Sequence, residues 1–344
     1  MDNHIKEVTL FRQEVDFVLC LACERKCKIP NDKYGFCKTR KNLNGKLYTC
    51  VYGDIASISA NPIEKKPFFH FYPGTKALTV GSWSCNFPCP WCQNYTLSKF
   101  PENRGKGEFI EPVKFIELLK LYNCQGTSIS LNEPTLLLEY ALEVFKLARK
   151  ENYYNTFVTN GYMTCEALQA LIDCGLNAMN MDIKGDSAAV KKYCDADLDV
   201  IFRNAAMAKN NSVWIELTTL VIPGINDGEA ELKEIARRIK GELGENTPWH
   251  VTAYYPAYEF ASGNLIQHPA TTTKTLERAR EIGIAASLKY VYLGNIPGHK
   301  YENTYCPECD KLLIQRAGFD VLKNYLKSPE NSCPNCSYKI DIIN

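Results

Sequence analysis

From Lys76 onward the chain alternates short apolar runs with longer amphipathic segments. The apolar runs predict strands, and these fall at residues 77–81, 128–131, 154–159, 178–183, 213–221, 250–254 and 290–293. The amphipathic segments between them predict helices at residues 112–122, 135–149, 165–174, 198–209, 228–239 and 272–286. In the second of these, Leu136, Tyr140, Val144 and Ala148 recur at every fourth position, which is the stripe of a helix that packs on a core.

Repeated alternation of strand and helix predicts an α/β fold with a parallel sheet and crossover helices. The sheet is either open and doubly wound or part of a full or partial α/β barrel. No Gly-x-Gly-x-x-Gly motif follows the first strand, which disfavours a dinucleotide-binding fold. In a barrel, the chemistry lies in the loops at the C-terminal ends of the strands.

Two Cys-rich segments flank this region, so we expect three domains: residues 1–60, 61–299 and 300–344. In the first, residues 47–54 and 55–59 predict two short strands around a turn at Gly53. Residues 61–74 have the three prolines of a linker but are unusually aromatic. Lys65, Lys66 and His70 in this linker either face a substrate or belong to a covering segment, and we favour the covering segment.

Composition limits the classes of function. The 344 residues carry a net charge of +1, which is too small for a strong, non-specific nucleic-acid binder. Residues 1–10 lack the apolar core of a signal peptide, and no run approaches 18 apolar residues. We therefore expect a cytoplasmic protein that does not span a membrane.

Eleven of the sixteen cysteines fall in three groups, which in a cytoplasmic chain indicates metal binding rather than disulfides. The other five are scattered and are expected to be single buried residues: Cys50, Cys124, Cys165, Cys174 and Cys194. The groups are a head set (Cys20, Cys23, Cys27 and Cys37), a cysteine triad (Cys85, Cys89 and Cys92) and a tail set (Cys306, Cys309, Cys333 and Cys336).

The two four-membered sets can each close a metal site. The tail set consists of two C-x2-C knuckles and predicts a structural, zinc-ribbon-like site. The head set suits either zinc or an additional iron–sulfur cluster, and zinc is the first expectation. The tail has no excess of basic residues, so we do not expect it to bind nucleic acid.

The cysteine triad, with spacing C-x3-C-x2-C, directly follows the first predicted strand of the main region. An ordinary four-iron–four-sulfur (4Fe-4S) cluster has four cysteine ligands, and so has a structural zinc site of this type. Three thiolates therefore suggest a cluster with one open iron, to which another group binds. A zinc or redox knuckle is the alternative.

The triad spacing resembles the signature of radical S-adenosylmethionine (SAM) enzymes. Together with Asn132-Glu-Pro-Thr, Thr159-Asn-Gly, Met181-Asp-Ile-Lys and Val221-Ile-Pro-Gly it resembles the pyruvate formate-lyase activating enzyme group. Over nearly the whole chain, further motifs resemble the AmmeMemoRadiSam system radical enzyme: Cys20-Leu-Ala-Cys-Glu-Arg-Lys-Cys, Asn61-Pro-Ile-Glu-Lys-Lys-Pro, His70-Phe-Tyr-Pro-Gly, Gly294-Asn-Ile-Pro-Gly and Asn303-Thr-Tyr-Cys-Pro-Glu-Cys.

This resemblance implies a partial, TIM-like barrel of six βα units with the 4Fe-4S cluster on the triad. The amino and carboxylate groups of SAM would bind the open iron. Reductive cleavage would give a 5′-deoxyadenosyl radical that abstracts hydrogen from a substrate. It also implies anaerobic handling, a ferredoxin or flavodoxin as electron donor, and AMMECR-type and Memo-type partner proteins.

Polar residues at the strand ends are the expected SAM contacts: Trp91, Asn132, Glu133, Thr159, Asn160, Asp182, Lys184 and Gly224. Glu133 suits the ammonium group, although an acid at a helix N-terminus is the alternative. Asp182 and Lys184 share one face of a strand and suit the ribose or the carboxylate, with a structural ion pair as the alternative. Leu131 and Asn132 stand where many radical SAM enzymes have two glycines.

Three functions remain open from the sequence. The first is a radical SAM enzyme that acts on an unidentified small molecule or lipid. The second is an activase that makes a glycyl radical on a protein partner, although the additional cysteines here precede the triad instead of following it. The third is a non-enzymatic zinc-binding interaction module.

Overall fold

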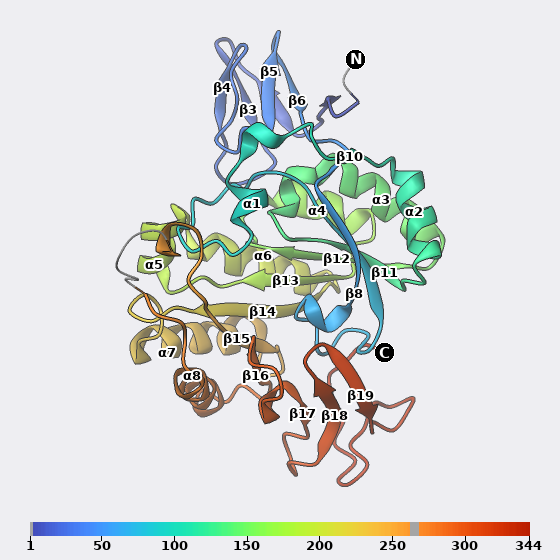
Figure 1. The fold of residues 1–344 in the computed structure, drawn as a ribbon, viewed down its shortest axis with the longest axis vertical. Helices are drawn as coiled ribbons and strands as arrows, with labels where there is room; N and C mark the ends of the chain where they lie inside the picture. The colour runs from blue at the N-terminus through green and yellow to red at the C-terminus, as the bar shows by residue number, and fades with distance from the viewer. Residues whose placement is uncertain (1–2, 262–267) are drawn as a thin grey trace.

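The computed structural model describes residues 3–261 and 268–344. At its centre lies an eight-stranded sheet with the order β16-β15-β14-β13-β12-β11-β9-β8 (Figure 1). Its parallel strands are β9 (Lys76–Gly81), β11 (Gly126–Ile129), β12 (Tyr154–Thr159), β13 (Ala178–Asp182), β14 (Trp214–Val221), β15 (Trp249–Ala253) and β16 (Val291–Gly294). The predicted parallel α/β sheet is therefore confirmed, with strand ends shifted by one or two residues.

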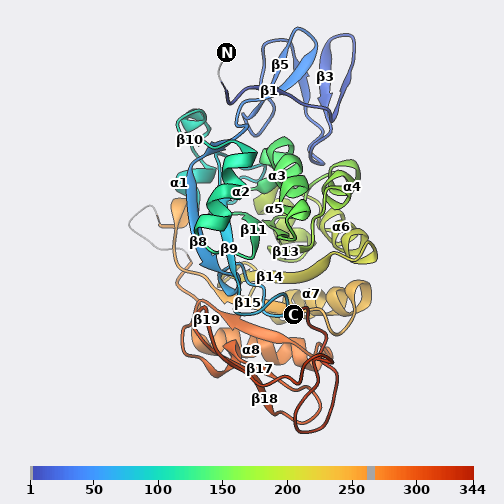
Figure 2. The same ribbon diagram turned by 90° about the vertical axis from the view of Figure 1, so that its right-hand side faces the viewer.

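Helices lie between successive strands, and the longer ones cover one side of the sheet, whereas the four-residue α1 lies apart from them (Figure 2). They are α1 (Tyr95–Ser98), α2 (Pro112–Leu121), α3 (Leu138–Lys150), α4 (Cys165–Asp173), α5 (Ser187–Cys194), α6 (Leu198–Asn210), α7 (Glu229–Arg238) and α8 (Thr273–Ala285). Short helical turns lie at η1 (Ile63–Lys65), η2 (Pro101–Asn103), η3 (Pro134–Leu137), η4 (Ile239–Leu243), η5 (Tyr258–Ala261) and η6 (Lys300–Glu302). The helix predicted at 135–149 thus consists of η3 followed by α3.

Helix α5 was missing from the sequence prediction. It is eight residues long and too short for a clear apolar stripe. It begins because the Asp186 side chain accepts a hydrogen bond from the Ala189 N–H at 2.8 Å. This helix matters for the site, because its last residue, Cys194, is buried beside the cysteine triad.

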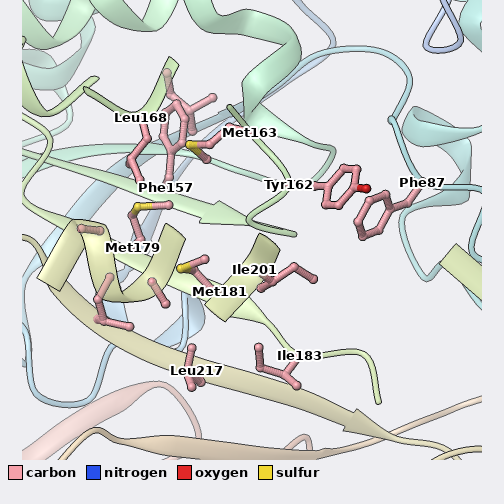
Figure 3. Packing of buried hydrophobic residues seen from close by; sticks show 14 of the residues in the cluster. Phe87, Phe157, Tyr162, Met163, Leu168, Met179, Met181, Ile183, Ile201 and Leu217 are labelled. Carbon is pink, nitrogen blue, oxygen red and sulfur yellow. The ribbon is translucent and has the colours of Figure 1, made fainter. Parts of the chain in front are cut away.

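A shared apolar core fixes the sheet against its helices. Figure 3 shows Phe157 of β12, Met181 of β13 and Leu217 of β14 near Leu168 of α4 and Ile201 of α6, and all five side chains are fully buried. Burial of a side chain of this size contributes about 1.5–3 kcal/mol. The loops at the strand ends are therefore mounted on a rigid support.

The head forms two small antiparallel sheets at one end of the molecule (Figure 1). One contains β1 (Lys6–Glu7), β6 (Lys46–Thr49) and β5 (Arg40–Leu43), and the other contains β2 (Phe11–Gln13), β3 (Phe17–Cys20) and β4 (Lys28–Pro30).

The two short strands predicted on either side of Gly53 are present with shifted bounds, but they belong to different sheets. Gly53 makes a turn with φ +62°, but the chain on either side of it belongs to different sheets. Before the turn, β6 ends at Thr49, and after it β7 (Asp54–Ile55) pairs with β10 (Glu108–Phe109). The next strand, β8 (Ser57–Pro62), joins the central sheet antiparallel to β9, so this sheet begins before residue 61. The Gly53 turn thus leads from the head into the central sheet.

Residues 61–74, called here the floor segment, cross the inner face of the sheet. Asn180 in the middle of β13 donates a hydrogen bond from Nδ2 to the Pro67 carbonyl at 2.8 Å. Phe68, Phe69 and Phe71 of the segment are buried. The aromatic composition of this linker therefore reflects packing, as the covering-segment interpretation predicted.

His70 in the floor segment has a structural position. Its side chain is fully buried, with Nδ1 2.7 Å from the Asp341 carbonyl and Nε2 2.5 Å from the Tyr292 hydroxyl. Burial lowers its pKa to about 4, so the ring is neutral at pH 7. The residue joins the floor segment to the sheet and to the C-terminal tail.

The tail forms a three-stranded antiparallel sheet of β17 (Thr304–Tyr305), β18 (Leu312–Ala317) and β19 (Asp320–Asn324). It lies at the end of the molecule opposite the head (Figure 1). The buried Arg316 guanidinium donates to the Phe69 carbonyl at 2.8 Å and to the Thr304 hydroxyl at 2.8 Å. The tail is therefore docked on the floor segment.

Candidate cofactor-binding site

The cysteine triad lies on the loop after β9, at the edge where the parallel strands end. Asn132, in the loop after β11, holds this loop. Its Oδ1 accepts a hydrogen bond from the Ser82 N–H at 2.9 Å, and its Nδ2 donates to the carbonyls of Trp83 and Ser84 at 3.3 and 3.1 Å. The predicted contact residue Asn132 thus positions the triad with its side-chain amide.

Two buried aromatic residues anchor the same loop. Phe87 packs edge-on against Tyr162 from the loop after β12, with ring centroids 5.3 Å apart (Figure 3). Trp91 packs against Tyr193 at 5.3 Å and Phe260 at 5.8 Å. Because both rings are nearly inaccessible to solvent, the backbone between the cysteines is held by packing on each side.

A cavity of about 300 Å³ adjoins this loop, within the range of pockets that hold small molecules and cofactors. All three cysteines of the triad line it. So do seven of the residues predicted from the sequence: Trp91, Asn132, Glu133, Thr159, Asn160, Asp182 and Lys184. Four strand ends therefore bring their polar side chains to one place.

Gly224 is not among the residues that line this cavity. It has φ +77°, and its N–H donates to Asp227 Oδ1 at 2.8 Å. This glycine serves a tight turn after β14, where a side chain would strain the backbone. From the same strand, Thr218 and Leu220 reach the cavity instead.

Glu133 is buried and accepts four hydrogen bonds. Its Oε1 accepts from the Thr135 N–H at 3.1 Å, the Thr135 hydroxyl at 2.5 Å and the Thr159 hydroxyl at 2.8 Å, and its Oε2 accepts from the Asn160 N–H at 2.9 Å. Burial raises the pKa of Glu133 in spite of these donors. Glu133 therefore caps η3, as the alternative interpretation held, while Oε2 keeps capacity for another donor.

Asp182 and Lys184 form an ion pair at the cavity wall, with Lys184 Nζ 2.8 Å from Asp182 Oδ2. Burial acts to lower the pKa of Lys184, but Asp182 and the thiols of Cys89 and Cys194 outweigh it and raise the pKa well above its ordinary value. Lys184 is therefore a permanent cation, and it stabilises negative charge on the triad.

Cys194 was not singled out from the sequence, yet its sulfur lies 3.6 Å from that of Cys89. The hydrogen bond between Cys194 and Cys89 lowers the pKa of Cys89. The two residues are 105 positions apart, and only the fold of α5 brings them together.

Leu131 has φ +76°, a conformation that bulky residues rarely adopt. Its side chain lines the cavity. Backbone strain of this kind costs about 1–3 kcal/mol and is typical of functional sites.

The floor segment closes the inner side of the cavity. Lys65 and Pro67 both line it, and the carbonyl of Pro67 is fixed by Asn180. Lys65 is exposed and makes no salt bridge within residues 3–261 and 268–344. Of the two interpretations of this segment, the covering role applies to His70, while Lys65 faces the cavity.

The head docks beside the triad. The Ser84 hydroxyl, next to Cys85, donates to the Cys37 carbonyl at 2.6 Å, and the Glu24 N–H donates to the Tyr162 carbonyl at 3.0 Å. A small void in the head is lined by all four thiols of the head set and also by Asn86 of the triad loop. The head set therefore lies next to the cofactor cavity.

The four sulfurs of the tail set lie within 4.8 Å of one another. Cys306 and Cys336 are 3.5 Å apart, and Cys309 and Cys333 are 3.6 Å apart. Four converging thiols form a group that can hold a metal ion. The prediction that the four cysteines of the tail lie close together is therefore confirmed.

Comparison with known proteins places this site in a family. The profile of the Radical SAM superfamily matches residues 83–239, from the triad loop through α7. The chain belongs to the radical SAM superfamily. It is therefore an enzyme of the SAM-using class, and the non-enzymatic zinc-binding alternative is wrong.

Similarity to other proteins extends beyond the radical SAM match. An uncharacterized protein of Methanocaldococcus jannaschii is 40% identical over 326 residues, which cover 95% of this chain and 96% of that protein. The isethionate sulfite-lyase activating enzyme of Nitratidesulfovibrio vulgaris is 27% identical over 172 residues, covering 48% of this chain and 54% of that enzyme. A radical SAM methyltransferase structure from Sphaerobacter thermophilus has a TM-score of 0.49 and 13% identity, covering 65% and 68% of the two chains.

The residues at the cavity suit the groups that radical SAM enzymes use. Three cysteines on one loop line the cavity, and the hydrogen bond with Cys194 lowers the pKa of Cys89. Glu133 Oε2 can accept from an ammonium group, and the Asp182–Lys184 pair offers both charges. No helix in the described residues is long and apolar enough to cross a membrane.

Proposed function

We propose that this radical SAM enzyme acts on a small molecule or lipid bound beside SAM in the cavity. The observation that carries this proposal is the convergence of the triad and four strand ends on one 300 Å³ cavity with a closed floor. A 4Fe-4S cluster on the triad would supply the electron that cleaves SAM to methionine and a 5′-deoxyadenosyl radical, which abstracts hydrogen from the substrate.

The geometry supports a role for each residue in this proposal. Cys85, Cys89 and Cys92 hold the cluster. Glu133 Oε2 accepts from the SAM ammonium, because it is the carboxylate oxygen with one hydrogen bond. Lys184 attracts the SAM carboxylate, and Asp182 holds Lys184 in place.

Further residues exclude water and define the substrate. The buried Trp91 ring offers an apolar surface for the adenine. Pro67 closes the floor. The ammonium of Lys65, which makes no salt bridge with the residues that the structure describes, favours a substrate with a carboxylate or phosphate group. We therefore expect an anionic substrate with an unreactive C–H bond.

The proposal includes the partners and metals that the sequence resemblance implies. A low-potential ferredoxin or flavodoxin donates the electron, and AMMECR-type and Memo-type proteins act in the same system. The chain has three domains, in which the head and the tail flank a partial barrel, and zinc occupies the tail set and stabilises the tail. The enzyme works in the cytoplasm.

A second function, activation of a glycyl-radical enzyme, is supported by the similarity to isethionate sulfite-lyase activating enzyme. In that case the substrate is a glycine of a protein partner rather than a small molecule in the cavity. The four additional cysteines precede the triad here, which is the feature that favours the first function.

The test is an anaerobic assay with dithionite and SAM that measures 5′-deoxyadenosine. The wild-type enzyme should form it, and Cys89→Ala should form none. Absence of product from wild type with a full, reducible cluster would contradict the proposal. With deuterated candidate substrates, deuterium in 5′-deoxyadenosine identifies the substrate, and transfer from a labelled glycine of a protein would favour the activase.

A further inference from the structure

Two side chains from outside the triad reach its sulfur atoms. Cys194 Sγ lies 3.6 Å from Cys89 Sγ, and Ser98 Oγ lies 3.0 Å from Cys92 Sγ. Ser98 is the last residue of α1 and Cys194 is the last residue of α5, so the two contacts come from separate parts of the chain. Both side chains are buried, so water competes little for either contact.

The direction of these hydrogen bonds is fixed once the triad binds iron. A cysteine binds iron as a thiolate and then has no proton to donate. The Cys194 thiol and the Ser98 hydroxyl each have a proton. They are therefore the donors, and the sulfurs of Cys89 and Cys92 are the acceptors.

Cys194 is placed as a donor and not as a further ligand. Ser98 and the three cysteines of the triad line the cavity, whereas Cys194 is fully buried and is not among the described residues that line it. A ligand of the cluster has to face the space that the cluster fills. Cys194 instead contacts Cys89 from the side of α5, away from the cavity.

Both donors are held in place by contacts of their own segments. The Arg25 guanidinium donates to the carbonyl of Cys194 at 3.2 Å and also to the carbonyl of Asn86 in the triad loop, so it joins the end of α5 to this loop. On the other side, the Ser84 N–H donates to the Leu97 carbonyl at 2.8 Å, which joins α1 to the start of the loop. The donors are therefore fixed relative to the sulfurs before any cofactor binds.

Donors at the ligand sulfurs affect how easily an iron–sulfur cluster is reduced. One-electron reduction adds a negative charge, part of which lies on the thiolate sulfurs. A hydrogen bond to such a sulfur stabilises the reduced state more than the oxidised state, and hydrogen bonds of this kind are among the factors that set the reduction potential of a cluster. In a buried site the effect is large, because water does not replace a missing donor.

We propose that Cys194 and Ser98 raise the reduction potential of the triad cluster by donating hydrogen bonds to Cys89 and Cys92. The step that they affect is the transfer of one electron from the low-potential donor to the cluster, in which no bond is formed or broken. This inference rests on the proposed function, because it requires a 4Fe-4S cluster on the triad. Both residues act through the ligands and do not bind iron themselves.

The experiment is a redox titration without oxygen and without SAM, followed by the EPR signal of the reduced cluster. The signal that is absent from Cys89→Ala belongs to the triad. Cys194→Ala and Ser98→Ala should each decrease the equilibrium constant for one-electron reduction by about tenfold, which lowers the potential by about 59 mV. Iron and sulfide contents should equal those of the wild type.

Two further variants separate hydrogen bonding from packing. Cys194→Ser keeps a proton donor at the same place, so its potential should not fall below that of the wild type. Cys174→Ala makes the same chemical change as Cys194→Ala at a buried cysteine that follows α4, and should leave the potential unchanged. If Cys194→Ser shows the same lowered potential as Cys194→Ala, the shift arises from packing and the inference is overturned.

The remaining outcomes distinguish this inference from the proposed function. Unchanged potentials in Cys194→Ala and Ser98→Ala, with a full cluster, would overturn the inference and leave the proposed function intact. Loss of iron from Cys194→Ala would also overturn it, because Cys194 would then be a ligand. A wild-type triad that holds no cluster after anaerobic isolation and reconstitution with iron and sulfide would contradict both.

Discussion

The two ends of the central sheet both contain buried polar residues, but they use them differently. At the N-terminal end, Glu216 accepts hydrogen bonds from the Phe69 and His70 N–H groups at 2.9 and 2.8 Å, from Trp214 Nε1 at 3.1 Å, and pairs with His250 Nε2 at 2.7 Å. At the C-terminal end, Glu133 Oε2 has a single donor and faces a cavity.

The difference between Glu216 and Glu133 shows which feature distinguishes a binding site from a buried structural contact. Glu216 and Glu133 are both buried and each accepts four hydrogen bonds, but Glu133 Oε2 accepts only one of its four and lies beside a cavity. The floor segment lies between these two ends of the sheet. On one side its backbone donates a hydrogen bond to Glu216, and on the other side its residues Lys65 and Pro67 line the cavity. Changes at the C-terminal end should therefore affect activity, and changes at the N-terminal end should affect stability.

The largest effect is expected at the triad. Cys89→Ala should reduce 5′-deoxyadenosine formation to background, because the cluster loses one of three protein ligands. Cys194→Ala is the matched control: it removes only the thiol that donates to Cys89 and should retain the iron of the triad. Iron content and product are measured together, and loss of iron in Cys194→Ala would make Cys194 a ligand.

The second effect concerns stability at the other end. Glu216→Gln replaces an oxygen that accepts N–H donors by an NH2 group, so at least one buried donor loses its acceptor. We expect a loss of about 3–5 kcal/mol in the free energy of unfolding. SAM cleavage per folded molecule should be unchanged. A loss of cleavage in the folded variant would contradict the claim that the N-terminal end of the sheet affects stability alone.

The same residue should give a pH dependence. Burial acts to raise the pKa of Glu216, but the hydrogen bond and charge of His250 outweigh it and leave the pKa below its ordinary value. A lowered carboxylate pKa contributes stability above about pH 4 that is lost as the pH falls through the folded-state value. In acid unfolding experiments, the wild type should lose this contribution to the free energy of unfolding as the pH falls, whereas Glu216→Gln should show no such loss.

A smaller effect is expected for the Asp182–Lys184 pair. Asp182→Asn leaves the Lys184 cation without its partner and should weaken SAM binding by about tenfold, or 1.4 kcal/mol. The loss is limited because both side chains are partly exposed. Asp173→Asn, on the exposed surface of α4, is the control, and equal SAM affinity in the two variants would argue against a role of the pair.

The smallest effect concerns the floor segment. Burial lowers the pKa of Lys66 to about 8, so the folded state loses this proton before the unfolded state does. Wild-type stability should therefore rise with pH between about 8 and 10.4. Lys66→Met should remove this rise and stabilise the protein at pH 7 by on the order of 1 kcal/mol. Lys65→Met, at the exposed neighbour, should leave the pH profile of stability unchanged.

The sequence predicted the features that depend on local pattern. The strands, most helices and the triad at the end of β9 follow from apolar runs and cysteine spacing, and seven of the eight predicted contact residues line one cavity. These residues lie around one cavity because the C-terminal ends of parallel strands meet at one edge, which brings together residues far apart in the sequence. Their contacts with SAM stay predictions.

Features that depend on long-range packing were not predictable. Cys194 reaches Cys89 through α5, a helix without a clear stripe, and Lys65 reaches the cavity because its linker folds back under the sheet. The sequence predicted that Gly224 lets the backbone approach the cofactor closely, whereas its positive φ belongs to a tight turn after β14. The turn at Gly53 was recognised, but the separation of the flanking strands into different sheets depends on how the head docks.

The central claim is that SAM binds at the C-terminal end of the sheet on a cluster held by the triad. Equilibrium binding of SAM to protein prepared without oxygen, before any reductant is added, tests it most directly. Wild type and Glu216→Gln should each bind one SAM per chain, and Cys89→Ala should bind none with comparable affinity. SAM binding that persists in Cys89→Ala, or is absent from wild type with a fully occupied triad, would contradict the account.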